Sequence, residues 1–335
     1  MTSKPPNSQP LGEFDLIARY LAPLATSKAA RGLRDDVAVL GLAGLGGDLV
    51  LNVDAIVAGV HFFADDPPNV IAERVLRVNL SDLAAKGAEP LGYLLTLALS
   101  TDQDEAWIAD FTEGLRRNQD TMGWSLLGGD TVRTSGLLTI SVTAIGQVET
   151  GTVPMRGGAQ PGDHIWVSGT IGDAALGLAV CQGKGPGLPT SLDDFVVERF
   201  RQPEPRLKLG QALVGTGMVS ASADVSDGLI ADLGHIAKAS GLCARIDGTL
   251  VPTSLAGGTA IAADPVWFER MITGGDDYEL LLTTPPSAAS QFEQIASDCG
   301  ISLTKIGLME QGAGVFVTNR QGNPLALETA GYRHF

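Results

Sequence analysis

The chain is poor in cysteine, with only Cys181, Cys243 and Cys299 among its 335 residues. The three are far apart, odd in number and without C-x-x-C spacing, so the sequence predicts neither a disulfide framework nor a zinc site. This usage fits a reducing compartment, and we expect a cytoplasmic protein. The polar, proline-rich start MTSKPPNSQP lacks the order of a signal peptide, so residues 1–10 are expected to form a disordered tail.

Positive charge is also scarce. The sequence has 23 lysines and arginines against 38 aspartates and glutamates, which gives a formal net charge of −15. Direct binding of nucleic acid or an anionic membrane needs an excess of basic residues, so neither partner is expected. If such an acidic protein binds phosphates, something else must neutralise them. Divalent metal ions that bridge carboxylates to phosphate oxygens supply that charge, as magnesium commonly does.

Long hydrophobic runs are missing as well. The most apolar candidate, LGYLLTLAL at 91–99, is far shorter than the roughly 20 residues that cross a bilayer, so it predicts a core strand instead. Hydrophobic residues still make up 44% of the chain. A chain of this length and composition can bury substantial cores and is expected to form two domains.

Helical and strand periodicities occur in both halves, which is typical of an α+β fold. The pattern predicts helices over 13–24, 69–86, 103–122, 173–182, 203–215 and 229–240. It predicts strands over 36–42, 48–57, 91–99, 137–148, 164–169, 280–285 and 315–320, and a strand end before the helix at 229. Because residues 151–163 are dense in turn formers, we expect an N-terminal domain over 11–150 and a C-terminal domain over 151–335, each of mixed α/β type.

The stretch ADVSDGLIADLGHIAKASG at 223–241 places two carboxylates before a helix. Asp227 or Ser226 is explained as the N-cap, whose side-chain oxygen accepts a backbone N–H that has no partner within the helix. Asp224 lies at least two residues before any cap position. It is therefore either a solvated loop acid or a ligand of a cation.

Acidic residues recur at expected turns and element ends, often beside glycine. They are Asp35, Asp36, Asp54, Asp130, Asp224, Asp227, Asp276 and Asp277. Glycine lets the backbone approach a ligand closely, and an acid beside it suits magnesium when substrate phosphates supply the other oxygens. The structural alternative is that each Gly-Asp pair is simply a good turn.

Asp82 lies inside a predicted helix and shares a face with Asn79, although an ion pair to Lys86 explains the same spacing. GTIGD at 169–173 places a glycine turn at a helix N-terminus, which could receive a phosphate. The G-x-x-x-x-G-K-[ST] signature is absent, and the four histidines form neither H-E-x-x-H nor a Ser-His-Asp order. The residues alone point to a magnesium-dependent enzyme that acts on phosphates.

Seven spaced motifs resemble the thiamine-monophosphate kinase family, which belongs to the aminoimidazole ribonucleotide synthetase superfamily. The resemblance runs from about residue 12 to the terminal GYRHF. The motifs are GEFDLIARYLAPL at 12–24, AGVHF at 58–62, VNLSDLAAKGAEP at 78–90, LGGDTVR at 127–133, PGDHIWVSGTIGDAALGL at 161–178, DVSDGLIADLGHIAKASG at 224–241 and GGDDYEL at 274–280.

This resemblance implies ATP-dependent phosphorylation of thiamine monophosphate to thiamine diphosphate with several magnesium ions and no side-chain nucleophile. It implies a homodimer whose N-terminal domains pair their sheets, with the ATP site bordering that interface. The matching metal positions are Asp36, Asn52, Val53, Asp54, Asp82, Asp130, Asp224 and Asp227. The matching ATP positions are Gly129, Asp130, Arg156 and Ser226, and the matching substrate positions are His61, Asp276 and Tyr332.

The sequence departs from the usual family pattern near these positions. Arg34 replaces a glycine, Asn52 to Ala55 replace a Ser-Thr-Asp-Thr type stretch, Val60 replaces an asparagine and Asp276 replaces a glutamate. Asn52 can still offer its amide oxygen and Val53 its carbonyl. Another ATP-dependent synthetase of the superfamily, or a thiamine-phosphate or nucleotide sensor that has lost catalysis, are the alternatives.

Overall fold

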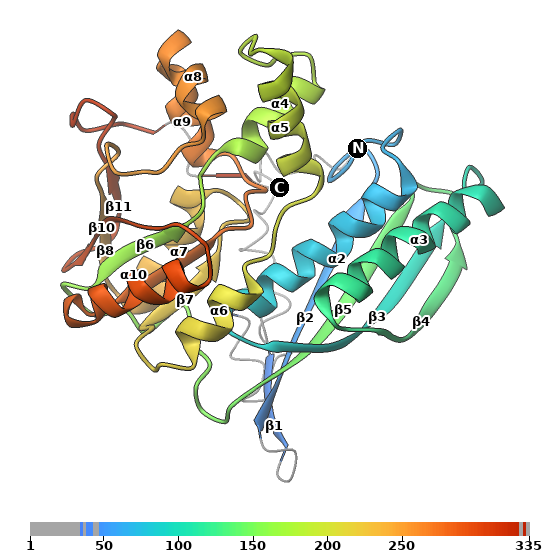
Figure 1. Ribbon diagram of the computed structural model, residues 1–335, viewed down its shortest axis with the longest axis horizontal. Coiled ribbons are helices and arrows are strands. Elements are labelled where there is room, and N and C mark those ends of the chain that lie inside the picture. The colour runs from blue at the N-terminus through green and yellow to red at the C-terminus, as the bar shows by residue number, and fades with distance from the viewer. Residues whose placement is uncertain (1–33, 36–37, 43–46, 328–330, 333–335) are drawn as a thin grey trace, which may run out of the picture.

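The computed structural model describes residues 34–35, 38–42, 47–327 and 331–332. Figure 1 shows two halves, each built on one β-sheet with helices beside it. In the first half the strand order is β1-β2-β5-β3-β4, and only β3 and β4 pair in parallel. The elements are β1 Ala38–Leu42, β2 Gly47–Val57, α2 Pro68–Ala85, β3 Glu89–Leu99, α3 Glu105–Met122, β4 Leu126–Arg133 and β5 Thr139–Val148.

The second half contains a six-stranded sheet in the order β11-β8-β10-β6-β9-β7. Its strands are β6 His164–Ser168, β7 Ala221–Asp224, β8 Cys243–Ile246, β9 Leu280–Thr284, β10 Leu303–Glu310 and β11 Gly314–Val317. Its helices are α4 Asp173–Cys181, α5 Thr190–Arg201, α6 Leu207–Val214, α7 Leu229–Ser240, α8 Leu255–Ala263, α9 Val266–Thr273, the short 3-10 helix η4 Pro286–Ala288 and α10 Ala289–Asp298. The expected α+β architecture of two mixed units is confirmed.

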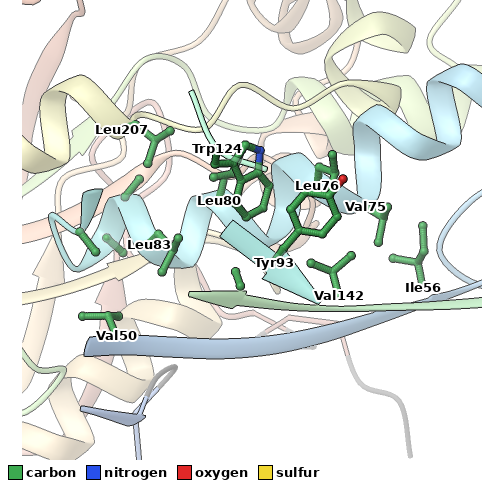
Figure 2. Packing of buried hydrophobic residues seen from close by; sticks show 14 of the residues in the cluster. Val50, Ile56, Val75, Leu76, Leu80, Leu83, Tyr93, Trp124, Val142 and Leu207 are labelled. Carbon is green, nitrogen blue, oxygen red and sulfur yellow. The ribbon is translucent and has the colours of Figure 1, made fainter. Parts of the chain in front are cut away.

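Helix α2 lies at the centre of the first core. Val75, Leu80 and Leu83 recur along one side of the helix and are fully buried against the sheet. Figure 2 shows this row facing Tyr93 of β3 and Val142 of β5. The α2 helix begins at Pro68, whose ring geometry suits the first position of a helix, and ends at Ala85 with Lys86 as the C-cap.

The second half covers another side of α2, because α6, β7 and β9 all contact it. Gly210 of α6 lies so close that an added Cβ would sit 1.9 Å from the carbonyl oxygen of Ala84. This double coverage buries polar α2 residues such as Asn79 and Ser81. Among the described residues, no helix combines the length and the apolar character needed to cross a membrane.

Most predicted elements are present, including α2, α3, α4 and α7, while the helix predicted over 13–24 lies outside the described residues. The helix predicted over 203–215 begins only at Leu207. Elements that the sequence did not predict are β4, α5, β8, α8, α9, α10 and β10. No element was predicted for LGGDTVR at 127–133, but these residues form most of β4 and pair in parallel with β3. Long-range pairing outweighs local glycine preference here.

Candidate active site

A cavity of about 980 Å³ is lined by residues of both halves. Helix α2 and strand β2 supply one part of its wall, and the segments after β7 and before β9 supply another. Ten of the positions that the family resemblance assigns to metal, ATP or substrate line it. They are Val53, Asp54, His61, Asp82, Arg156, Asp224, Ser226, Asp227, Asp276 and Tyr332. The fold therefore brings residues from distant motifs to one site.

Asp54 of β2 and Asp82 of α2 are held beside each other by two asparagines. Asn52 Nδ2 donates to Asp82 Oδ2 at 2.8 Å and to Asn79 Oδ1 at 3.1 Å. Asn79 Oδ1 also accepts the backbone N–H of Asp54 at 3.2 Å. The shared face of Asn79 and Asp82 thus connects α2 to β2 at the cavity.

The proposed alternative for Asp82 was an ion pair with Lys86. The buried Lys86 ammonium instead lies 2.7 Å from Asp35 and also donates to the Ser222 carbonyl at 3.0 Å. Its charge still acts on Asp82, since it partly opposes the rise in the pKa of that carboxyl. Lys86 therefore connects the Asp35 segment, α2 and β7 beneath the acids.

Asp224 ends β7 and accepts a hydrogen bond of 2.5 Å from Ser81 Oγ of α2. The expectation that Ser226 or Asp227 caps α7 was wrong, because the N-cap position is Gly228 with φ 113°. Asp232 in the first turn of α7 accepts the backbone N–H groups of both Ser226 and Asp227, each at 3.0 Å. Here a residue inside the helix accepts hydrogen bonds from the residues before the helix. A glycine with positive φ stands between them, and the sequence pattern did not predict this conformation.

Burial and neighbouring charge make the acids hard to ionise. Burial, together with the charge of Asp224, raises the pKa of Asp54 to about 6. Burial, and to a smaller extent the negative charge of Asp54, raises the pKa of Asp82 well above its usual range. Burial likewise raises the pKa of Asp224, although the Ser81 hydrogen bond opposes the rise. The site is short of positive charge, which is the condition that a bound cation corrects.

Within the described residues, no three side chains of His, Cys, Asp or Glu form a complete metal cage. Magnesium commonly uses only one or two carboxylates together with substrate phosphates and water, so an all-protein cage is not required. Asn52 Oδ1 is buried and has no hydrogen-bond partner. The Nδ2 atom of the same side chain donates to Asp82 Oδ2, so this oxygen lies near a carboxylate. An open amide oxygen beside carboxylates fits a hard cation such as magnesium.

Two predicted ATP positions, and the predicted metal position Asn52, are not among the residues that line the cavity. Gly129 and Asp130 lie on β4, and neither lines the cavity. Asp130 is exposed and accepts the N–H of Thr131 at 2.8 Å. Gly129 is required by close packing, because a Cβ there would sit 1.8 Å from the Leu95 carbonyl oxygen. Asp36 lies outside the described residues.

The glycine turn at 169–173 does not offer a vacant anion site. The Asp277 carboxylate accepts the backbone N–H of Gly172 at 2.6 Å and that of Ala174 at 3.2 Å, at the start of α4. Burial nevertheless raises the pKa of Asp277 well above its ordinary value. The hypothesis of phosphate binding at this helix N-terminus was wrong, since a side chain of the protein itself fills the position.

The three substrate-side positions are fixed close to the acids. Asp276 N–H donates to the Ser226 carbonyl at 2.8 Å, and Tyr332 N–H donates to the Asp227 carbonyl at 3.0 Å. His61 Nδ1 accepts the backbone N–H of Val57 at 3.0 Å, which orients its ring. Asp276 and Tyr332 thus adjoin residues expected to meet nucleotide and metal, and His61 lines the same cavity.

Sequence reasoning missed Arg74, Asp232 and the pairing of Lys86 with Asp35. Arg74 makes a 2.7 Å ion pair with Asp276 from the buried side of α2. A signal was available, since Arg74 lies in α2 and Lys86 at its C-cap, among buried apolar residues such as Val75. Charged side chains at such positions are rarely buried without a partner, so each one indicates an unseen contact.

Two family models match the chain: AIR synthase related protein, N-terminal domain, over residues 34–148, and its C-terminal domain over 160–319. The thiamine-monophosphate kinase of Caulobacter vibrioides is 44% identical over 92% of this chain and 87% of its own. The structure of the Stenotrophomonas maltophilia thiamine-monophosphate kinase has 37% identity and a TM-score of 0.76, covering 92% of this chain and 98% of that chain. The structure of AaThiL complexed with AMPPCP and TMP has 29% identity and a TM-score of 0.84, and the match covers 99% of this chain and 100% of that chain. The chain belongs to the thiamine-monophosphate kinase family.

Proposed function

We propose that the protein transfers the γ-phosphoryl group of ATP to thiamine monophosphate, forming thiamine diphosphate and ADP. One observation carries this proposal: carboxylates from both halves, Asp54 and Asp82 on one side and Asp224 and Asp227 on the other, line a single cavity. The names of the relatives support the choice of substrates, as does the pairing of AMPPCP with TMP in the AaThiL structure.

The chain's own residues divide the work between the two substrates. Asp54, Asp82, Asp224 and Asp227 would hold magnesium, with Asn52 Oδ1 and the Val53 carbonyl as further oxygen ligands and Asp36 as a family-implied ligand. Bound magnesium offsets the negative charge of the phosphates during transfer. Arg156 and Ser226 would contact the nucleotide, while His61, Asp276 and Tyr332 would contact the acceptor.

Transfer is direct and in line. A phosphate oxygen of thiamine monophosphate forms a bond to the γ-phosphorus as the bond to the bridging oxygen of ADP breaks. No side-chain nucleophile is needed, because the two substrate regions adjoin through the Asp276 and Ser226 backbone contact. Isolation of a phosphorylated protein that is competent to turn over would contradict this route.

We propose that the active form is a homodimer joined through the first-half sheets. Leu94 of β3 is 41% exposed and Leu127 of β4 is 58% exposed, and an added Cβ at Gly92 would sit 2.6 Å from Leu127 Cγ. Tyr93, next to Leu94, points into the core, so the exposed leucine faces the opposite side. Exposed leucines grouped on a sheet favour an interface.

Gly129 and Asp130 also lie on β4. They remain proposed ATP contacts, which would border that interface.

The domain boundary and location are also proposals. Residues 11–150 would form the ATP, magnesium and dimerisation domain, and 151–335 would complete the nucleotide and substrate sites. Cys181, Cys243 and Cys299 are all unpaired, which supports a cytoplasmic enzyme.

A substrate panel with ATP and magnesium tests the proposed function. We expect ADP release with thiamine monophosphate and none with aminoimidazole precursors. Turnover of an aminoimidazole precursor but not thiamine monophosphate would favour another synthetase of the superfamily. Binding of thiamine monophosphate without ADP release would instead indicate a sensor.

A further inference from the structure

Arg74 of α2 is only 3% exposed, yet it holds two residues of the cavity wall. Its Nη2 lies 2.7 Å from Asp276 Oδ1. Its Nη1 donates to the Phe200 carbonyl, and its guanidinium carbon lies 4.7 Å from the centre of the Phe200 ring. Both Asp276 and Phe200 line the cavity, whereas Arg74 does not. Arg74 therefore supports the wall from behind.

The segment that Arg74 holds has an unusual backbone. Asp276 has φ 73° and Tyr278 has φ 51°, a left-handed region that residues with side chains rarely adopt. Such residues persist only when their surroundings fix them. The Asp276 and Tyr278 N–H groups donate to the carbonyls of Ser226 and Val225, both at 2.8 Å. The Arg74 ion pair adds the side-chain restraint that these backbone contacts do not provide.

Arg74 also orients the Asp276 carboxylate. Its guanidinium pairs with Oδ1 and offsets part of the carboxylate charge. Asp276 then acts as an oriented hydrogen-bond acceptor rather than as an isolated negative charge. The side chain of Asp276 is 28% exposed, which leaves it accessible from the cavity.

We propose that Arg74 is a positioning residue for the acceptor substrate, holding the Asp276 carboxylate and the Phe200 wall in the arrangement that binds thiamine monophosphate. This inference rests on the proposed function for its substrate. Arg74 serves the acceptor side, since its ion pair is with Asp276 and its other contacts are with Phe200. Its loss is therefore expected to change acceptor binding more than nucleotide binding.

Arg77 provides a matched control one turn further along α2. Its Nε lies 3.0 Å from Glu73, and its Nη1 donates to the Pro203 carbonyl at 3.2 Å. Arg77 thus has an ion pair and a contact with the second half, but neither it nor Glu73 lines the cavity. Arg74→Met, Arg74→Lys and Arg77→Met are compared with the wild-type protein. Arg74→Lys keeps the charge but loses the planar fork that reaches Asp276 and Phe200 together.

The kinetic experiment measures KM and kcat for both substrates at saturating magnesium. Arg74→Met is expected to raise the KM for thiamine monophosphate by about tenfold, the factor expected from losing one orienting charged contact. The KM for ATP is expected to stay within about twofold, and Arg74→Lys is expected to recover part of the loss. Equal increases in both KM values, or the same increase in Arg77→Met, would overturn the inference.

Amide hydrogen exchange supplies a readout that does not need turnover. Arg74→Met is expected to speed exchange of the Asp276 and Tyr278 amides, while Arg77→Met leaves them unchanged. Unchanged exchange at both amides in Arg74→Met would also overturn the positioning role. If Arg74→Met does not fold, the same measurements on Arg74→Lys decide the matter. A wild-type protein that does not phosphorylate thiamine monophosphate would refute the proposed function. The exchange result would still test whether Arg74 holds the Asp276 to Tyr278 segment in place.

Discussion

Ser81 Oγ donates a hydrogen bond of 2.5 Å to Asp224 Oδ2, although the two residues are 143 positions apart in the chain. Ser81 lies in α2 of the first half and Asp224 ends β7 of the second. The bond fixes the carboxylate of one motif against the helix that carries Asp82. The relative placement of the two halves therefore determines the geometry of the acid cluster.

Asp224→Asn should abolish most magnesium-dependent turnover while leaving the fold intact. The change keeps the side chain's shape and removes a charge that we assign to metal binding, so a loss of about a hundredfold or more is expected. Without magnesium, the variant should be more stable by on the order of 1 kcal/mol, because one buried carboxylate no longer opposes the others. ADP release and thermal unfolding, with and without magnesium, measure both effects.

Asp48→Asn is the matched control, since Asp48 lies on β2 like Asp54 but does not line the cavity. It should change neither turnover nor the response to magnesium. Near-normal turnover of Asp224→Asn at limiting and saturating magnesium would make Asp224 a structural acid only.

Asp54 should give the metal-free protein a specific pH dependence. Burial and the Asp224 charge raise its pKa from 3.8 to about 6. The folded state then binds more protons than the unfolded state between about pH 4 and 6, so stability falls as pH rises through this window. The contribution of Asp54 is at most about 3 kcal/mol. Urea unfolding in a chelator at several pH values from 4.5 to 7 measures the slope.

The same series on Asp54→Asn isolates this group. The variant should lose part of the slope and be more stable than the wild type at pH 7. Added magnesium should stabilise the wild type more than the variant at that pH. Identical slopes in both proteins would show that Asp54 does not titrate in this range.

The Asp232 side chain should contribute more to the free energy of unfolding than the side chain of Asp227, whose backbone N–H it accepts. Asp232→Ala removes the acceptor of both the Ser226 and Asp227 N–H groups, which should cost about 1–3 kcal/mol in urea unfolding. Asp232→Asn keeps an acceptor oxygen and should retain most of that stability. Asp227→Ala should cost less than Asp232→Ala, since Gly228 and not Asp227 occupies the cap position. A larger loss from Asp227→Ala than from Asp232→Ala would contradict this assignment.

Local sequence patterns predicted part of the fold and of the site, whereas other parts depend on contacts between residues far apart in the chain. The apolar spacing in α2 was sufficient to predict a helix, and the shared face of Asn79 and Asp82 followed from helical geometry. The sequence also correctly separated Asp224 from the cap position. The hydrogen bonds from Ser226 and Asp227 to Asp232 accompany a glycine with positive φ at the cap, however, and the Arg74 to Asp276 ion pair joins residues 202 positions apart. Spacing along one segment carries no information on such contacts.

The last prediction concerns the proposed dimer. Leu127→Asp places a charge on the exposed sheet face that carries Leu94, where burying it in an interface without a partner would be costly. The variant should therefore shift the protein from dimer to a monomer of 34.8 kDa and lower turnover, because the proposed ATP site borders the interface. Leu250→Asp is the control, since Leu250 is also exposed but lies in the second half. Light scattering at micromolar concentration, with turnover measured on the same samples, compares the two. An active wild-type monomer, or a Leu127→Asp protein that remains dimeric, would refute an interface on this face.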